Sequence, residues 1–148
     1  MASTHVNEDA RMKIYVNRIP DEGLREHAAY DPAGMDMDRL DIRLVEPFEV
    51  DAVIALADRE LVIRADIRVP LRLTCARCLE EFASVITPGA VFSYKVHPSD
   101  VVDITDDVRQ EILLSYPVRF LCREECRGLC LRCGGNLNQG PCGCSMTN

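Results

Sequence analysis

The sequence contains no tryptophan, and aromatic residues make up only 5% of its 148 residues. A core without large rings must be mostly aliphatic. No apolar run approaches the roughly 18 residues that a membrane-spanning helix needs. The N-terminal sequence MASTHVNEDARM contains acids where a signal peptide has basic and apolar residues. We therefore expect a cytoplasmic protein that does not bind a membrane, with residues 1–11 as a flexible N-terminus.

Motifs of enzyme active sites are also absent. The three histidines, His5, His27 and His97, have no nucleophile or carboxylate at a motif spacing, and no glycine loop of the phosphate-binding kind is present. Asp106 and Asp107 are most simply the acidic start of a helix. The sequence therefore predicts a protein that is not an enzyme and has no small-molecule substrate.

Hydrophobic alternation gives the clearest structural signal. Every odd position from 61 to 73 is apolar, whereas four of the six even positions between them are charged, which predicts a half-buried strand. A similar alternation over 48–56 ends at the polar sequence ADRE and predicts an antiparallel hairpin. Further strands are expected at 12–19 and, broken around Pro88 and Gly89, at 82–96. The segment between the first strand and about residue 38 is expected to be partly helical or irregular.

A change of period marks one helix. In ITDDVRQEILLSYP, residues 104–117, apolar residues recur every four positions and proline follows the last turn. The expected fold is α+β: an antiparallel β meander or partly closed sheet packed by one main helix. We expect a core domain at 12–117 and a cysteine-rich zinc-binding tail at 118–148 that packs on the core. No internal repeat is visible.

Charge is distributed unevenly along the chain. The net charge is −7, and residues 1–62 alone hold seven basic and fourteen acidic residues. The two segments that carry cysteine are instead basic. If these segments meet in space, they form a cationic end that suits RNA phosphates. The candidate RNA-binding residues are Arg72, Arg77, Arg119, Arg123, Arg127 and Arg132.

Eight cysteines occur in close pairs, in the sequences CARC, CREEC, CLRC and CGC. Disulfide frameworks are typical of secreted chains, so pairs in a cytosolic chain favour metal binding. A redox dithiol is disfavoured because the first pair follows an antiparallel strand, whereas thioredoxin-like motifs lie in a βαβ pattern. A glycine directly after CLRC permits the positive backbone angle that a metal-binding turn often needs.

Four thiolates in a reducing compartment match structural zinc sites, although iron–sulfur ligation also uses four cysteines. The expected cofactor is one or two structural Zn²⁺ ions. Short loops assign Cys130, Cys133, Cys142 and Cys144 to a local site. The second expected site joins Cys75 and Cys78 to Cys122 and Cys126 across 43 intervening residues.

Three segments together resemble a known family: CARCLEEF at 75–82, DDVRQEILLSYP at 106–117 and the tail LCREECRGLCLRCGGNLNQGPCGC. With the tail signature G-L-C-x-x-C-G-x-N-L-N, they resemble the YceD-like family, the large ribosomal RNA subunit accumulation proteins, over roughly residues 12–144. The family knuckle often reads C-P-x-C, whereas Leu131 follows Cys130 here.

The resemblance implies a cytoplasmic, non-enzymatic factor in ribosome assembly that helps 23S ribosomal RNA of the large subunit, or its precursor, to accumulate. It also implies a large-subunit ribosomal protein as a partner. Two alternatives remain open from the residues themselves. One is a zinc-stabilised protein adaptor without direct RNA contact, and the other is a thiol redox protein.

Overall fold

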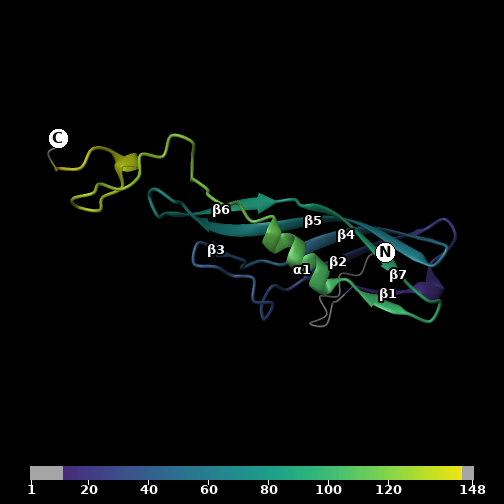
Figure 1. Ribbon diagram of the computed structural model, residues 1–148. Helices are drawn as coiled ribbons and strands as arrows, with labels where there is room; N and C mark the ends of the chain where they lie inside the picture. The colour runs from purple at the N-terminus through teal and green to yellow at the C-terminus, as the bar shows by residue number, and fades with distance from the viewer. Residues whose placement is uncertain (1–11, 145–148) are drawn as a thin grey trace, which may run out of the picture.

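The computed structural model describes residues 12–144 (Figure 1). The segment expected to be flexible, with His5, lies outside the described residues, as do residues 145–148 of the expected tail. The elements are β1 (Lys13–Tyr15), η1 (Val16–Arg18), β2 (Leu24–Tyr30), β3 (Ile42–Arg43), β4 (Phe48–Ala57), β5 (Glu60–Thr74), β6 (Glu81–Ile86), β7 (Gly89–Lys95), β8 (Val101–Asp103), α1 (Thr105–Leu114) and η2 (Leu137–Gln139).

Strand β5 is the central element of a six-stranded antiparallel sheet. It pairs with β4 and β7 along its first half and with β3 and β6 along its second half, while β2 extends the sheet beyond β4. The predicted alternation is confirmed, because every odd residue of β5 from 61 to 73 is at most 2% exposed. The odd residues of β5 therefore determine which face of the sheet is buried.

Local sequence explains the turns between these strands. Asp58 and Arg59 both have positive φ, as a two-residue hairpin turn requires, and they connect β4 to β5 as the ADRE sequence predicts. Strands β6 and β7 follow β5 in one continuous register, interrupted only at residues 87–88. At the interruption the Ile67 N–H donates to the Pro88 carbonyl at 2.9 Å, so the predicted break is bridged.

Two expectations about the sheet are corrected. A partly closed sheet is not supported, since in the described residues β2 pairs only with β4 and does not reach β3, β6 or β7. Residues 24–30, expected to be helical or irregular, form β2. This edge strand lacks a clear alternation because most of its residues are exposed, and its pairing with β4 determines its conformation.

Helix α1 lies across one face of the sheet (Figure 1). Its predicted four-residue period is confirmed, because Ile104, Val108 and Ile112 are fully buried in the aliphatic core. Just before the helix, the Asp103 carboxylate accepts a hydrogen bond from the Thr105 backbone N–H at 2.9 Å. Neither this helix nor the short 3-10 turns within residues 12–144 are long and apolar enough to cross a membrane.

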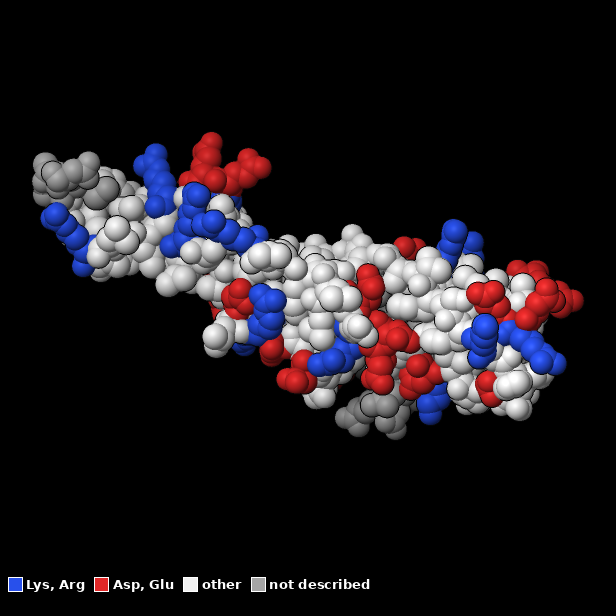
Figure 2. Space-filling view, in the orientation of Figure 1, with Lys and Arg blue, Asp and Glu red and all other residues white. Residues whose placement is uncertain are grey.

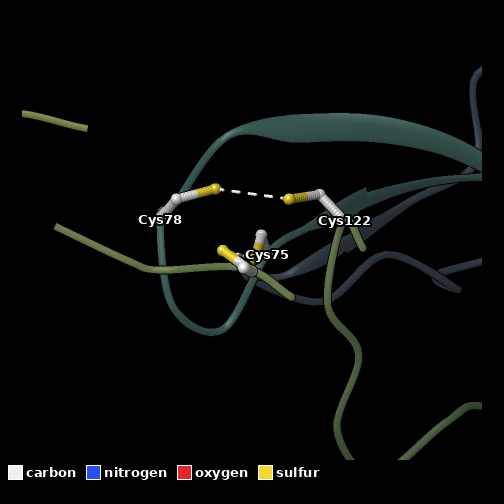
Figure 3. A group of neighbouring side chains, drawn as sticks. Cys75, Cys78 and Cys122 are labelled. Atoms are coloured by element: carbon white, nitrogen blue, oxygen red, sulfur yellow. Dashed lines mark hydrogen bonds between the residues drawn. The ribbon is translucent and has the colours of Figure 1, made fainter. Parts of the chain in front are cut away.

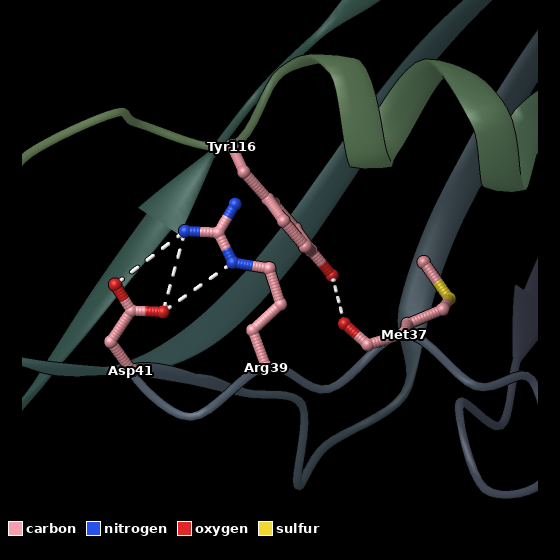
Figure 4. A network of polar contacts seen from close by, with 4 residues as sticks. All are labelled: Met37, Arg39, Asp41 and Tyr116. Atoms are coloured by element: carbon pink, nitrogen blue, oxygen red, sulfur yellow. Dashed lines mark hydrogen bonds and ion pairs between the residues drawn. The ribbon is translucent and has the colours of Figure 1, made fainter.

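The end of α1 is fastened to the loop before β3 (Figure 4). The Tyr116 hydroxyl donates to the Met37 carbonyl at 2.7 Å, and the Arg39 guanidinium lies 5.7 Å from the centre of the Tyr116 ring. Arg39 also pairs with Asp41, and the Asp41 carbonyl accepts from the Thr74 N–H at the end of β5. These contacts bring the start of the cysteine-rich tail to the end of β5.

Candidate metal centres

The first group of cysteines, called centre 1 here, joins the end of β5 to the tail. Cys75 and Cys78 lie in the turn between β5 and β6, and Cys122 and Cys126 lie in the segment after α1. The Sγ atoms of Cys75 and Cys126 are 3.6 Å apart. Those of Cys78 and Cys122 are also 3.6 Å apart (Figure 3). Three of the four side chains are at most 3% exposed. The two segments, far apart in sequence, therefore meet at one buried point.

The second group, centre 2, is formed by Cys130, Cys133, Cys142 and Cys144. It lies farther along the tail and is more exposed, with only Cys130 buried. The two spatial groups are the two sets that the loop lengths predict. In each group all four sulfurs lie within 4.8 Å of one another.

The geometry suits a tetrahedral metal ion. A Zn–S bond of about 2.3 Å places the sulfurs of a tetrahedron about 3.8 Å apart, close to the 3.6 Å found in centre 1. A disulfide would need sulfurs about 2.05 Å apart, and all eight cysteines are free. Both tetrads are therefore positioned to hold metal ions.

The turns that present the cysteines of CARC and CLRC have the same backbone hydrogen bonds. In the first, the Cys75 N–H donates to Glu80 O at 2.9 Å and the Leu79 N–H donates to Cys75 O at 3.1 Å. In the second, the corresponding bonds run from Cys130 to Gly135 at 2.8 Å and from Gly134 to Cys130 at 2.9 Å. The shared C-x-R-C spacing thus produces the same six-residue turn twice.

The residue after the second cysteine has positive φ in both turns. Gly134 has a φ of 75°, which confirms the positive backbone angle predicted for the glycine after CLRC. Leu79 occupies the same position in centre 1 with φ of 61°, a conformation that costs a bulky residue of order 1 to 3 kcal/mol. This strain must be offset by the contacts that hold the turn.

Burial and hydrogen bonds shift the pKa values of the thiols in opposite directions. Burial disfavours the Cys75 thiolate, but backbone N–H groups of Cys78, Cys122 and Arg77 outweigh burial and lower the pKa of Cys75 to about 6. Burial and the neighbouring sulfurs raise the pKa of Cys78 to about 12. In centre 2, backbone N–H groups of Cys133 and Arg132 lower the pKa of Cys130 to about 6.

Electrostatic repulsion between the sulfurs explains why some thiol pKa values are raised. Contact with Cys133, together with burial, raises the pKa of Cys144 to about 12. Four negative sulfurs this close repel one another, so some keep their protons unless a cation neutralises the group. A bound divalent ion would displace those protons, since only thiolates are ligands.

Further contacts attach the tail to the sheet around centre 1. The Ala76 N–H donates to Phe120 O at 3.0 Å, and the Arg77 guanidinium donates to Cys126 O at 3.0 Å. The Phe82 and Phe120 rings meet edge to face at 6.4 Å between their centres. Arg77, a candidate for RNA contact, therefore also clamps the tail, which its position in the sequence does not reveal.

The asparagines of the N-L-N sequence also have structural contacts that the sequence alone does not indicate. The Asn138 amide nitrogen lies 3.3 Å from Cys126 Sγ, and its hydrogen bond is the main cause that lowers the pKa of Cys126. The Asn136 side chain accepts from the Asn138 N–H at 2.9 Å. A residue between ligands of centre 2 thus contacts a sulfur of centre 1.

The candidate arginines gather at one end of the molecule. Figure 2 shows Lys and Arg side chains over the cysteine-rich end, with some acidic ones beside them, and a body on which many acidic side chains are interspersed with basic ones. All six candidates are exposed, and within residues 12–144 none of them forms an ion pair with a carboxylate. Arg72 lies on the outward face of β5, opposite Arg43, and lines a shallow groove with Arg68. The six candidates are Arg72, Arg77, Arg119, Arg123, Arg127 and Arg132.

Comparison with known proteins gives two matches, each to part of the chain. A family model described as "Large ribosomal RNA subunit accumulation protein YceD" matches residues 92–148. A relative from Arabidopsis thaliana, "Large ribosomal RNA subunit accumulation protein YCED homolog 1, chloroplastic", is 38% identical over 53 residues. This alignment covers 34% of the present chain and 16% of the relative. No solved structure matches the chain.

The pKa values predict that metal affinity depends steeply on pH. In each tetrad at least two thiols have raised pKa values, Cys78 with Cys122 and Cys142 with Cys144, and a metal must displace their protons. The Zn²⁺ affinity of each centre should therefore fall at least about a hundredfold for each unit by which the pH is lowered below 7. Competition with a chelator of known pH dependence measures this slope, and a flat profile would contradict thiol ligation.

Replacing a cysteine of centre 2 should loosen the tail and leave the sheet intact, because no tail cysteine belongs to the aliphatic core. In Cys133→Ser, amide hydrogen exchange should become faster over 127–144 and stay slow in β4 and β5. The matched variant Cys78→Ser should also release residues 118–126. Loss of protection throughout the sheet in Cys133→Ser would show instead that the tail is integral to the core.

Proposed function

From the resemblance to the YceD-like family, which the comparisons confirm for residues 92–148, we propose that this protein is a non-enzymatic ribosome-assembly factor. It promotes the accumulation of large-subunit 23S ribosomal RNA, or of its precursor, in the cytoplasm. The observation that carries this proposal is the match of residues 92–148, which include the cysteine-rich tail, to a family model named for that role. Centre 1 is mostly buried, and each centre has cysteines in a hydrogen-bonded turn. This arrangement favours a structural role for the cysteines.

We assign Zn²⁺ to both centres. Zinc has no redox chemistry, prefers a tetrahedron of thiolates in structural sites and needs no open position for a substrate. The backbone N–H groups that point at Cys130 Sγ and Cys133 Sγ, each at 3.4 Å, stabilise thiolate ligands in the way that supporting hydrogen bonds usually do. When bound, the ion would supply the positive charge that lets all four thiols of a centre ionise.

The cationic end is the proposed contact with RNA. Arg123, Arg127 and Arg132 are exposed beside the metal centres and have no carboxylate partner within the described part of the chain. Unpaired guanidinium groups on a rigid support suit phosphate oxygens. The acidic body would repel RNA elsewhere and so confine contact to this end.

A second candidate, a protein adaptor that reaches the ribosome through a large-subunit ribosomal protein, is favoured by a different observation. Three large apolar side chains are exposed at the cysteine-rich end, namely Leu79 at 62%, Val118 at 97% and Leu131 at 103%. Exposed large apolar side chains often contribute to protein interfaces. This candidate requires a partner but no RNA contact.

Metal content tests the cofactor assignment. Purified under reducing conditions without added metal, the protein should contain two zinc ions per chain, because each tetrad provides four thiolates. Elemental analysis measures the stoichiometry. Iron in place of zinc, or no metal, would refute the assignment, and a single ion would leave only one tetrad as a structural site.

Salt dependence tests the RNA contact. Changing Arg123, Arg127 and Arg132 together to Gln should weaken binding to ribosomal RNA and lower the logarithmic salt slope by roughly 2 to 3, since each phosphate contact contributes about 0.7 to 0.9. Filter binding over a salt series measures both quantities.

The matched control changes three exposed arginines of the body, Arg25, Arg59 and Arg64, to Gln. It removes the same charge and should leave the slope nearly unchanged. Equal effects of the two triple variants would indicate non-specific attraction. Unaltered binding of the tail variant, with zinc retained, would favour the adaptor.

A further inference from the structure

Asn138 belongs to centre 2 by sequence and to centre 1 by contact. It lies in η2, in the loop between Cys133 and Cys142, and its Nδ2 atom is 3.3 Å from Sγ of Cys126. Its Oδ1 atom accepts a hydrogen bond of 2.9 Å from the Arg127 N–H. Since Oδ1 must face that donor, the amide NH₂ must face the sulfur.

Backbone contacts hold this side chain in place. The Leu137 N–H donates to Gly128 O at 2.9 Å, and Leu129 forms an antiparallel bridge with Asn136. The loop between Cys133 and Cys142 therefore packs against residues 127–129. These residues connect the last cysteine of centre 1 to the first cysteine of centre 2. Gly128, with φ of 78°, makes the turn, and a Cβ there would lie 3.4 Å from the Arg77 carbonyl oxygen.

The chemistry of the contact favours a ligand sulfur. An amide NH₂ can only donate, and a thiolate is a better acceptor than a thiol. Hydrogen bonds to metal ligands orient them and commonly change metal affinity by 10- to 100-fold. The loop that carries Asn138 is itself closed by the ligation of Cys133 and Cys142 in centre 2.

We propose that Asn138 is a positioning residue that couples the two metal centres, so that filling centre 2 strengthens metal binding at centre 1. The inference rests on the proposed binding of metal by both tetrads. With centre 2 filled, the loop is ordered and the amide is held at Cys126 Sγ. With centre 2 empty, the loop is released and centre 1 loses this hydrogen bond. Because coupling free energies are reciprocal, filling centre 1 strengthens centre 2 by the same factor.

Two substitutions at Asn138 separate the sulfur contact from the rest of its role. Asn138→Asp keeps an oxygen for the Arg127 N–H but replaces the donor that faces Cys126 with a negatively charged oxygen. Asn138→Ala removes both bonds. The neighbouring Gln139→Ala, an exposed position, is the control. Zinc affinity is measured on the full chain by chelator competition, with the amide NMR signals of Cys78 and Arg132 reporting the filling of centres 1 and 2.

Asn138→Asp should lower the Zn²⁺ affinity of centre 1 by about 10- to 100-fold, and Gln139→Ala should leave it unchanged. Emptying centre 2 with Cys142→Ser and Cys144→Ser should lower the affinity of centre 1 by a similar factor. In the Asn138→Ala background the same two cysteine changes should have little further effect, as a double-mutant cycle requires of a shared pathway.

Four results would overturn the proposal. Unchanged affinity of centre 1 in Asn138→Asp would show that the sulfur contact has no role. An equal loss from the cysteine changes with and without Asn138 would show that other contacts transmit the effect. Wild-type protein without metal would refute the metal centres themselves, and the coupling with them, whereas normal zinc content with independent centres would refute the coupling alone.

Discussion

Strand β5 constrains almost everything else in the molecule. Its strict alternation assigns one face to the core, and its 15 residues provide the edges on which four other strands form. The last buried position of the pattern, Leu73, is followed after one residue by Cys75, which is also fully buried. The strand therefore places the first cysteine of centre 1 in fixed register, and α1, held through Tyr116, brings the start of the tail to the same place.

The tail has a different source of order from the sheet. Around centre 1 the buried residues are three cysteines, with a few partly buried apolar neighbours. So small a cluster buries too little apolar surface to offset the conformational entropy of some 25 residues. Metal ligation is the kind of interaction that supplies the difference in small modules. The sheet and the cysteine-rich end would then respond independently to chelators and to denaturants.

The sequence predicts the elements whose signal is local. Alternation identifies β4 and β5, a four-residue period identifies α1, and loop length groups the eight cysteines as the structure places them. It fails for β2, because an exposed edge strand is formed by pairing with β4 and leaves no pattern of its own. Sequence reasoning also missed the strained turn at Leu79 and the Asn138 contact. The turn and the contact both depend on which segments of the chain pack together. The spacing of residues in the sequence does not indicate this packing.

The 43 residues between Cys78 and Cys122 separate the two halves of centre 1 in sequence, and therefore also in the time of their synthesis. At 5 to 20 residues per second, a ribosome needs roughly 2 to 9 s to add them. During this interval the N-terminal half of the site is a lone dithiol at the end of a newly formed strand. Such a dithiol is open to oxidants and to the wrong metal until its partners emerge. Assembly of this protein is therefore most vulnerable before its own synthesis is finished.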